Sequence, residues 1–192
     1  MSSTSAVFVG DGTLLARCAQ AWCDAGHTVA FVATRNAEVA QWARQQGIAH
    51  RLIAAGEAVD LPQLGFDYFF SVANLEVLPP ALLRRARKLA INFHDGPLPR
   101  YAGLNAPAWA LVQGEREHGV TWHEMTDRVD AGRIVKQKTF AIAPDETALS
   151  LNARCWEAGL AAFAEIASDA ARGELPLLPQ SGARTYFARD RR

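Results

Sequence analysis

The chain has 192 residues, of which 49% are hydrophobic, which is enough for one domain with a sizeable core and too many for a disordered chain. Its 20 basic and 20 acidic residues give no net charge, so no overall field attracts nucleic acid or an anionic membrane. The 3 cysteines include no closely spaced pair, which disfavours a disulfide framework and a thiolate zinc site. The sequence shows no signal-peptide pattern and no long apolar span, and we expect a cytoplasmic protein without a membrane partner.

The first half of the sequence alternates predicted strands and helices. Strands are expected at 6–10, 28–33, 68–72 and 89–93, and helices at 14–25, 37–46 and 80–87. Gly26 and Gly47 follow the first two helices as C-terminal caps, and Pro80 opens the third. This alternation predicts an α/β fold with a doubly wound, Rossmann-like, mostly parallel sheet flanked by helices.

The second half contains fewer and longer predicted elements. Helices are expected at 105–113 and 146–172, and two strands, which could pair in antiparallel fashion, at 119–125 and 134–142. After Gly173 the chain is rich in proline, and we expect residues 173–192 to be a partly ordered tail. The whole of 1–192 is therefore predicted to be a single domain.

A glycine-containing turn, VFVGDGTLL, follows the first strand. Two glycines between a strand and a helix would allow a phosphate to sit on the helix N-terminus. The dinucleotide fingerprint requires a third glycine, where this chain has Leu15. A tight turn explains Gly10 and Gly12 equally well, so a nucleotide-binding module is a disfavoured alternative.

The segment INFHDGPLPRYAG places polar side chains at the end of an apolar strand. Asn92 and His94 are two residues apart and project from the same face of that strand. An amide beside an imidazole can serve as a pair of oxyanion donors, or as an acid/base with a helper. Alternatively, His94 is a hydrogen-bonded core histidine and Asn92 caps a turn.

A second polar segment, DRVDAGRIV, follows the strand that contains His123. Asp130 could orient a histidine brought from elsewhere, or could simply favour a turn through its side-chain-to-backbone bonds. His123 lies in an alternating strand and fits a buried structural residue. A metal site made by His94, His123 and Asp130 is a further alternative that their spacing does not require.

Taken together, NFH, LPRYAG, PAWAL, GVTWH and VDAGRI, with AIAPDETALSL and the TYFAR tail, cover nearly the whole chain. In this order they resemble the 10-formyltetrahydrofolate-dependent formyltransferase family. Within it, the sequence is most similar to sugar-nucleotide N-formyltransferase domains and to the N-terminal formylation domains of nonribosomal peptide synthetases. The resemblance implies an N-formyltransferase of one-carbon metabolism.

The resemblance implies a catalytic trio of Asn92, His94 and Asp130. In such enzymes an amine attacks the formyl carbon carried on the folate N10. Asn92 and protonated His94 would stabilise the oxyanion, while Asp130 would pair with the cationic form of His94 and help move a proton through a water.

The resemblance also implies a slot for the folate, with 10-formyltetrahydrofolate as formyl donor and no metal. One wall would be the loop with Glu76, Val77 and Leu78. The other would be Thr126, Asp127, Arg128 and Val129. Recognition would rest mainly on the backbone of these loops.

The acceptor is implied to be a primary amine on an amino-sugar nucleotide or a carrier-bound amino acid, with substrate contacts at Asp95, Tyr101 and Asn105. The chain reads HDGPLP where the family usually has a serine at the position of Gly96, and Asp95 adds a carboxylate. The neutral charge, and the lack of the barrel-like domain of initiator-tRNA formyltransferases, disfavour a nucleic-acid partner. A formyltetrahydrofolate hydrolase, or a non-catalytic folate-binding domain of a larger multidomain synthetase, remain alternatives.

Overall fold

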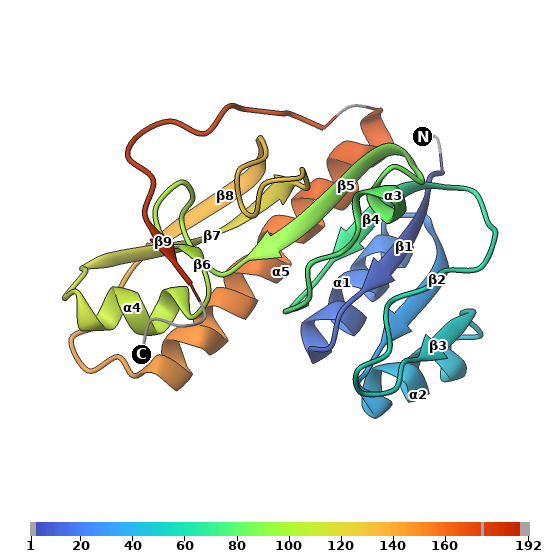
Figure 1. Cartoon of the computed structure of the whole chain (residues 1–192), viewed down its shortest axis with the longest axis horizontal. Helices are drawn as coiled ribbons and strands as arrows, with labels where there is room; N and C mark the ends of the chain where they lie inside the picture. Colours follow the sequence, from blue (N-terminus) through green and yellow to red (C-terminus); the bar gives the residue numbers. More distant parts are fainter. Residues whose placement is uncertain (1–2, 174, 189–192) are drawn as a thin grey trace. The chain divides into compact units, whose positions relative to one another are not determined.

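A computed structural model describes residues 3–173 and 175–188, which form two compact units. Unit 1 lies within 1–92 and 164–175, and unit 2 lies within 93–163 and 176–192. The strands form a seven-stranded sheet in the order β3-β2-β1-β4-β5-β7-β8 (Figure 1). Every pairing among the first five strands is parallel, which confirms the predicted mostly parallel α/β fold.

Unit 1 is the alternating part of the chain. Its elements are β1 (Ser5–Val9), α1 (Thr13–Asp24), β2 (Thr28–Thr34), α2 (Ala37–Gln45), β3 (His50–Leu52), β4 (Phe66–Ser71), α3 (Pro80–Leu83) and most of β5 (Ala86–His94). Ala6 to Phe8 are fully buried at the centre of this sheet, because helices cover the faces of a parallel sheet. At the end of β1, a Cβ added to Gly10 would lie 1.7 Å from the carbonyl oxygen of Val72. This close approach explains the glycine by packing alone.

Two predictions for unit 1 were wrong. The helix expected at 80–87 ends at Leu83, and Ala86 already pairs with Phe66 as the first residue of β5. The guanidinium of Arg85 donates to the carbonyl oxygens of Leu61 and Pro62, which fixes the chain at the point where the helix stops. The short strand β3 was missed, because two of its three residues are exposed and show no apolar alternation.

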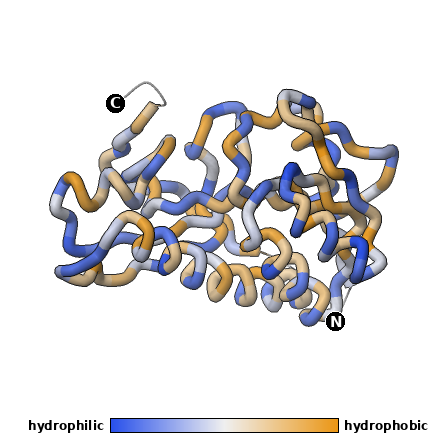
Figure 2. Tube along the Cα trace, turned by 90° about the horizontal axis from the view of Figure 1, so that it is seen from below, coloured by the Kyte–Doolittle hydropathy of each residue, from blue (hydrophilic) through white to orange (hydrophobic). Residues whose placement is uncertain are grey.

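Unit 2 contains β6 (Ala102–Gly103), α4 (Ala106–Val112), β7 (Glu117–Glu124), β8 (Ile134–Ala141), the first part of α5 (Ala148–Arg172) and β9 (Tyr186–Phe187). Strands β7 and β8 are antiparallel, as predicted. Helix α5 packs closely at Gly159, where an added Cβ would lie 2.4 Å from the ring of Phe93. The indole of Trp122 donates to the carbonyl oxygen of the same glycine. Figure 2 colours the chain by hydropathy, and along its helical parts hydrophobic residues alternate with hydrophilic ones.

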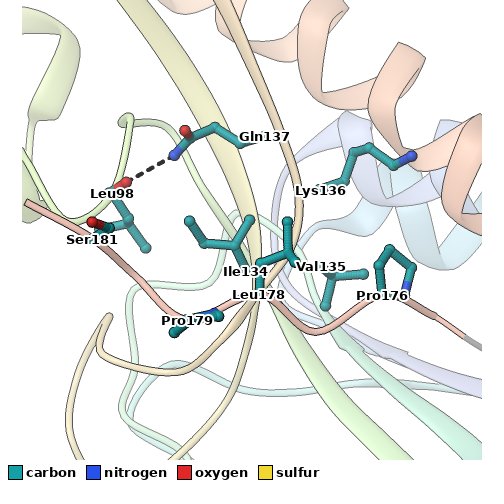
Figure 3. A pocket seen from close by; sticks show the side chains of 9 residues that line it. All are labelled: Leu98, Ile134, Val135, Lys136, Gln137, Pro176, Leu178, Pro179 and Ser181. Atoms are coloured by element: carbon teal, nitrogen blue, oxygen red, sulfur yellow. Dashed lines mark hydrogen bonds between the residues drawn. The ribbon is translucent and has the colours of Figure 1, made fainter.

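The C-terminal segment of unit 2 contacts the rest of the unit through strand pairing and ring stacking. Leu178 bridges Ile134 at the start of β8, and β9 pairs in parallel with β6. Phe187 stacks on Trp109 and on Tyr101. A pocket of about 430 Å³ lies between this segment and the start of β8 (Figure 3). Of the tail expected to be partly ordered, residues 174 and 189–192 lie outside the described residues.

Among the described residues, the structure contains no helix with the length and apolar character needed to cross a membrane.

Candidate active site

His94 is the last residue of β5 and its side chain is only 5% exposed. Its Nε2 lies 2.7 Å from the backbone carbonyl oxygen of Tyr101, and because that oxygen only accepts, Nε2 carries a hydrogen. The other ring nitrogen, Nδ1, faces two carboxylates, with Asp130 Oδ2 at 3.7 Å and Asp95 Oδ1 at 4.0 Å. Both separations are longer than a direct hydrogen bond, so the carboxylates act on Nδ1 mainly through their charge. Nδ1 is thus the nitrogen available for chemistry.

Asp130 is buried and held in place from two sides. Its Oδ2 accepts a hydrogen bond from the backbone N–H of Gly103 at 2.8 Å, and its Oδ1 lies 3.3 Å from Nε2 of His123. Burial pushes the pKa of Asp130 upward, but the hydrogen bond from His123, the neighbouring histidine charges and the Gly103 N–H outweigh it and lower the pKa to about 2. The carboxylate is therefore ionised at neutral pH. The residue adopts φ 51°, a left-handed conformation that Asp tolerates better than most residues.

His123 is buried, as its strand pattern suggested, but it does more than fill the core. Its Nδ1 lies 2.9 Å from the carbonyl oxygen of Glu124, and its Nε2 faces Asp130. The rings of His94 and His123 meet edge to face with centroids 6.4 Å apart. The two histidines therefore share one carboxylate, and the orienting role considered for Asp130 fits this arrangement.

The turn after His94 is held by β7. The hydroxyl of Thr121 donates to the carbonyl oxygen of Gly96 and accepts from the N–H of Leu98. The side-chain amide of Gln137 donates to the Leu98 carbonyl oxygen (Figure 3) and also to the Thr121 hydroxyl. Thr121 and His123 are two residues apart and lie on one face of β7, so strand alternation in GVTWH could have indicated their shared role.

Gly96 is needed for the close packing around His94. An added Cβ would lie 2.8 Å from His94 Nε2, 3.0 Å from the carbonyl oxygen of Tyr101 and 3.0 Å from Cβ of Ala106. A side chain at this position would press on both partners of the hydrogen bond that fixes the imidazole. The lack of room for a side chain explains why Gly96 stands where the family usually has serine.

Asn92 precedes His94 by two residues in β5 and is half-buried. Since alternate residues of a strand share a face, its carboxamide projects from the same face as the imidazole. Both residues belong to β5, and their joint action at one reaction centre stays a prediction.

The C-terminal segment holds the loop that carries Asp130. The side-chain amide of Gln180 donates to the carbonyl oxygens of Asp130 and Gly132, at 3.0 and 2.8 Å. Arg184 donates to the carbonyl oxygen of Val129 at 2.7 Å. Sequence reasoning missed both residues, because they lie about fifty positions from the loop and only the pairing of the tail brings them there.

In unit 1, the predicted folate-binding residues lie in the loop after β4. Val77 is 83% exposed, whereas Leu78 is 4% exposed and belongs to the core. Glu76 turns its carboxylate to Arg35, with 2.6 Å between Oε2 and Nη2. The three residues therefore differ: the side chains of Glu76 and Val77 reach solvent, whereas that of Leu78 is buried.

In unit 2, the other predicted folate-binding residues, Thr126 to Val129, are all exposed. The hydroxyl of Thr126 donates to the carbonyl oxygen of Arg128 and accepts from its N–H, which closes the loop on itself. The residues form a compact exposed turn leading into Asp130. Their contact with a folate stays a prediction.

The three predicted substrate contacts are placed differently. Asp95 is 31% exposed beside His94, and Asn105 is exposed at the start of α4 with φ 59°. Tyr101 is buried, and its hydroxyl lies 2.7 Å from acceptor oxygens of both Gln113 and Glu115. Its described contacts are internal, so a substrate role for this side chain rests on the resemblance alone.

In the part of the chain that the structure describes, no group of three or more His, Cys, Asp or Glu side chains is arranged to hold a metal ion.

Comparisons with known proteins identify the family of the chain. The Formyl transferase family model matches residues 4–166. A methionyl-tRNA formyltransferase from Synechococcus sp. (strain JA-3-3Ab) is 35% identical over 128 residues, which are 67% of this chain and 40% of that protein. The chain thus covers well under half the length of this curated relative.

Solved structures share the fold. A glycinamide ribonucleotide transformylase from Symbiobacterium toebii aligns with a TM-score of 0.81 at 20% identity, over 92% of this chain and 94% of that one. An N-formyltransferase from Helicobacter canadensis, in complex with folinic acid and dTDP-3-aminofucose, aligns with a TM-score of 0.76 at 19% identity, over 98% and 71%. Because the family model spans most of the sequence, the chain belongs to the formyl transferase family.

Proposed function

We propose that this protein transfers a formyl group from 10-formyltetrahydrofolate to a primary amine of a small molecule, such as an amino-sugar nucleotide, or of a carrier-bound amino acid. The observation that carries the proposal is the surroundings of His94. One imidazole nitrogen is fixed by a backbone carbonyl, and the other faces a buried and a partly exposed carboxylate. An imidazole held in this way can donate a hydrogen bond to a developing oxyanion.

The reaction makes one bond and breaks one. The neutral amine forms a C–N bond with the formyl carbon, the bond from that carbon to folate N10 breaks, and the amine proton finally resides on N10. The N–H of His94 and the carboxamide of Asn92 donate to the formyl oxygen as it gains negative charge. The protein holds these donors on one strand face, so little reorganisation is required.

Asp130 acts electrostatically in this scheme. With a pKa of about 2 it remains ionised at neutral pH and is too weak a base to keep a proton. Its negative charge, 3.7 Å from Nδ1 of His94, favours positive charge on the imidazole as the reaction proceeds. His123 and the Gly103 N–H keep the carboxylate in position.

The residues present suit a folate donor. Exposed loops follow β4 and precede Asp130, and exposed backbone can recognise the flat pterin ring through hydrogen bonds. We propose that Glu76, Val77 and Leu78 line one side of the pterin and Thr126 to Val129 the other, with Glu76 acting as an anchor for its loop. The complex of the Helicobacter canadensis structure with folinic acid supports a reduced folate.

Asp95 suits an amine acceptor. Its carboxylate is partly exposed and lies beside the proposed reaction centre, where it can attract a cationic amine. The dTDP-3-aminofucose of the Helicobacter canadensis complex supports an amino-sugar nucleotide. One matched relative is named for methionyl-tRNA, but the zero net charge of this chain disfavours a nucleic-acid acceptor.

The proposal is tested by incubating the protein with 10-formyltetrahydrofolate and a panel of amino-sugar nucleotides and carrier-bound amino acids. Mass spectrometry detects the formylated amine, and absorbance detects loss of the donor. Amine-dependent donor loss supports transfer, whereas donor loss that yields formate without any amine would establish the hydrolase instead. Folate binding without either product would indicate a non-catalytic binding domain.

A further inference from the structure

We propose that Arg35 is a positioning residue for the formyl donor, because it fixes the folate-binding loop through the side chain of Glu76. This inference rests on the proposed function, and it assigns a role to Arg35, to which neither sequence motifs nor the reaction chemistry pointed.

Arg35 connects three loops. Its backbone N–H donates to Oδ1 of Asp11 at 2.7 Å, and its Nη2 donates to the carbonyl oxygen of Glu57 at 2.9 Å and to Oε2 of Glu76 at 2.6 Å. Its Nη1 lies 3.6 Å from Oδ2 of Asp11. The guanidinium offers several donors in a rigid plane, so one side chain can serve all three loops.

The topology explains why these loops meet. Arg35 directly follows β2, Asp11 lies in the turn after β1, and Glu76 lies in the loop after β4. Strand β1 pairs in parallel with both β2 and β4, so their carboxyl ends share one edge of the sheet. This is the edge where open α/β sheets bind ligands.

The loop after β4 needs such support. Ala73 adopts φ 50°, an unfavourable conformation for an alanine, and Leu75 and Val77 are 70% and 83% exposed. The side chain of Asn74 brackets the backbone of Glu76, accepting from its N–H and donating to its carbonyl oxygen. The internal bonds shape the turn, and the bond from Arg35 ties it to the sheet.

Burial of the guanidinium separates this contact from an ordinary surface ion pair, although the Glu76 carboxylate is itself 47% exposed. The Arg35 side chain is 17% exposed, whereas Arg51, which pairs with the Glu57 side chain in the same unit, is 44% exposed. Exposed pairs of the second kind contribute little, because solvent screens them and both side chains lose entropy. Arg51 therefore provides a matched control.

The expected consequence is weaker donor binding with intact chemistry. Without Arg35 the loop samples several conformations, and the donor must order it on binding. We expect Arg35→Met, which keeps the apolar stem, to raise the Kd for 5-formyltetrahydrofolate about tenfold, equivalent to about 1.4 kcal/mol. The KM for the donor should rise similarly while kcat stays within about twofold, because the lost interaction stabilises the bound donor equally in the ground state and in the transition state.

A double-mutant cycle identifies the partner through which Arg35 acts. Glu76→Ala should weaken folate binding as much as Arg35→Met, and the double variant should be no weaker than either single one. Arg51→Met removes an exposed ion pair of the same unit but leaves the Glu76 contact, and should leave Kd unchanged. Calorimetric titration with 5-formyltetrahydrofolate measures the wild type and the four variants, with circular dichroism to verify folding.

An unchanged Kd in Arg35→Met, or fully additive effects of Arg35→Met and Glu76→Ala, would overturn the inference while wild-type folate binding still supported the proposed function. Failure of the wild-type protein to bind folate would instead remove the proposed function itself. If Arg35→Met is unfolded, Glu76→Ala, whose partner retains its bonds to Asp11 and Glu57, decides the matter alone.

Discussion

Replacing Gly96 with serine tests how closely the imidazole is fixed. The new Cβ would sit 2.8 Å from His94 Nε2, a separation that real Cβ atoms essentially never show, and 3.0 Å from the Tyr101 carbonyl oxygen, which is unusually tight. Either the imidazole or the Tyr101 loop must shift, and the 2.7 Å hydrogen bond between them is lost. Overpacking of this kind costs roughly 1–3 kcal/mol of folding free energy. A shift of about 1 Å in a catalytic group lowers turnover by about 10²-fold.

The assay is kcat for formyl transfer to the acceptor identified by the panel, together with the midpoint of thermal unfolding. We expect Gly96→Ser to lose about two orders of magnitude in kcat. Gly114→Ala is the control, because its added Cβ would have no described atom within 4 Å and only the strain at φ 67° remains. It should lower stability by about 1 kcal/mol and leave kcat unchanged. Wild-type kcat in Gly96→Ser would refute the idea that glycine is needed to seat the histidine.

The remaining predictions concern Asp130 and its surroundings. His94→Ala and Asp130→Ala should each abolish formyl transfer with circular dichroism unchanged, and near-normal turnover in either would contradict the mechanism. Gln180→Ala should lower kcat about tenfold by freeing the Asp130 loop, whereas Ser181→Ala in the same segment should not; equal kcat values would show that the segment is not needed for positioning. The pKa of Asp130 falls from 3.8 to about 2 on folding, so its contribution to stability is complete above pH 4 or so and is lost as the pH falls toward 2. The contribution of Asp130 amounts to about 2 kcal/mol of unfolding free energy. The stability of Asp130→Asn should therefore not fall between pH 4 and pH 2 through this group. If its stability depends on pH as that of the wild type does, the acid sensitivity arises from other residues.

Local sequence signals were sufficient for the elements of unit 1 and for the strand face that carries Asn92 and His94. Apolar runs separated by glycine-capped helices predict parallel strands, and the strands and helices begin and end within a few residues of the expected positions. The exceptions are β3, which was missed because it shows no apolar alternation, and α3, where tertiary contacts of Arg85 override its helix propensity and stop the helix at Leu83.

Contacts between distant segments could not be predicted in the same way. Asp130 and His94 were expected to meet only because the sequence resembles a family, since nothing local brings a loop thirty-six residues away to the end of β5. Gln180 and the bridge from Arg35 to Glu76 lie outside any motif. Tyr101 was expected to face the substrate, yet hydrogen bonds to Gln113 and Glu115 and stacking on Phe187 bury it.

The central claim, that this chain binds a reduced folate as formyl donor, is tested most directly by calorimetric titration of the wild-type protein with 5-formyltetrahydrofolate. Saturable binding in the micromolar range, with one folate per chain, is the predicted result. Absence of measurable heat or saturation at millimolar folate would contradict the account, because the residues around His94 would then lack the donor on which their proposed chemistry depends.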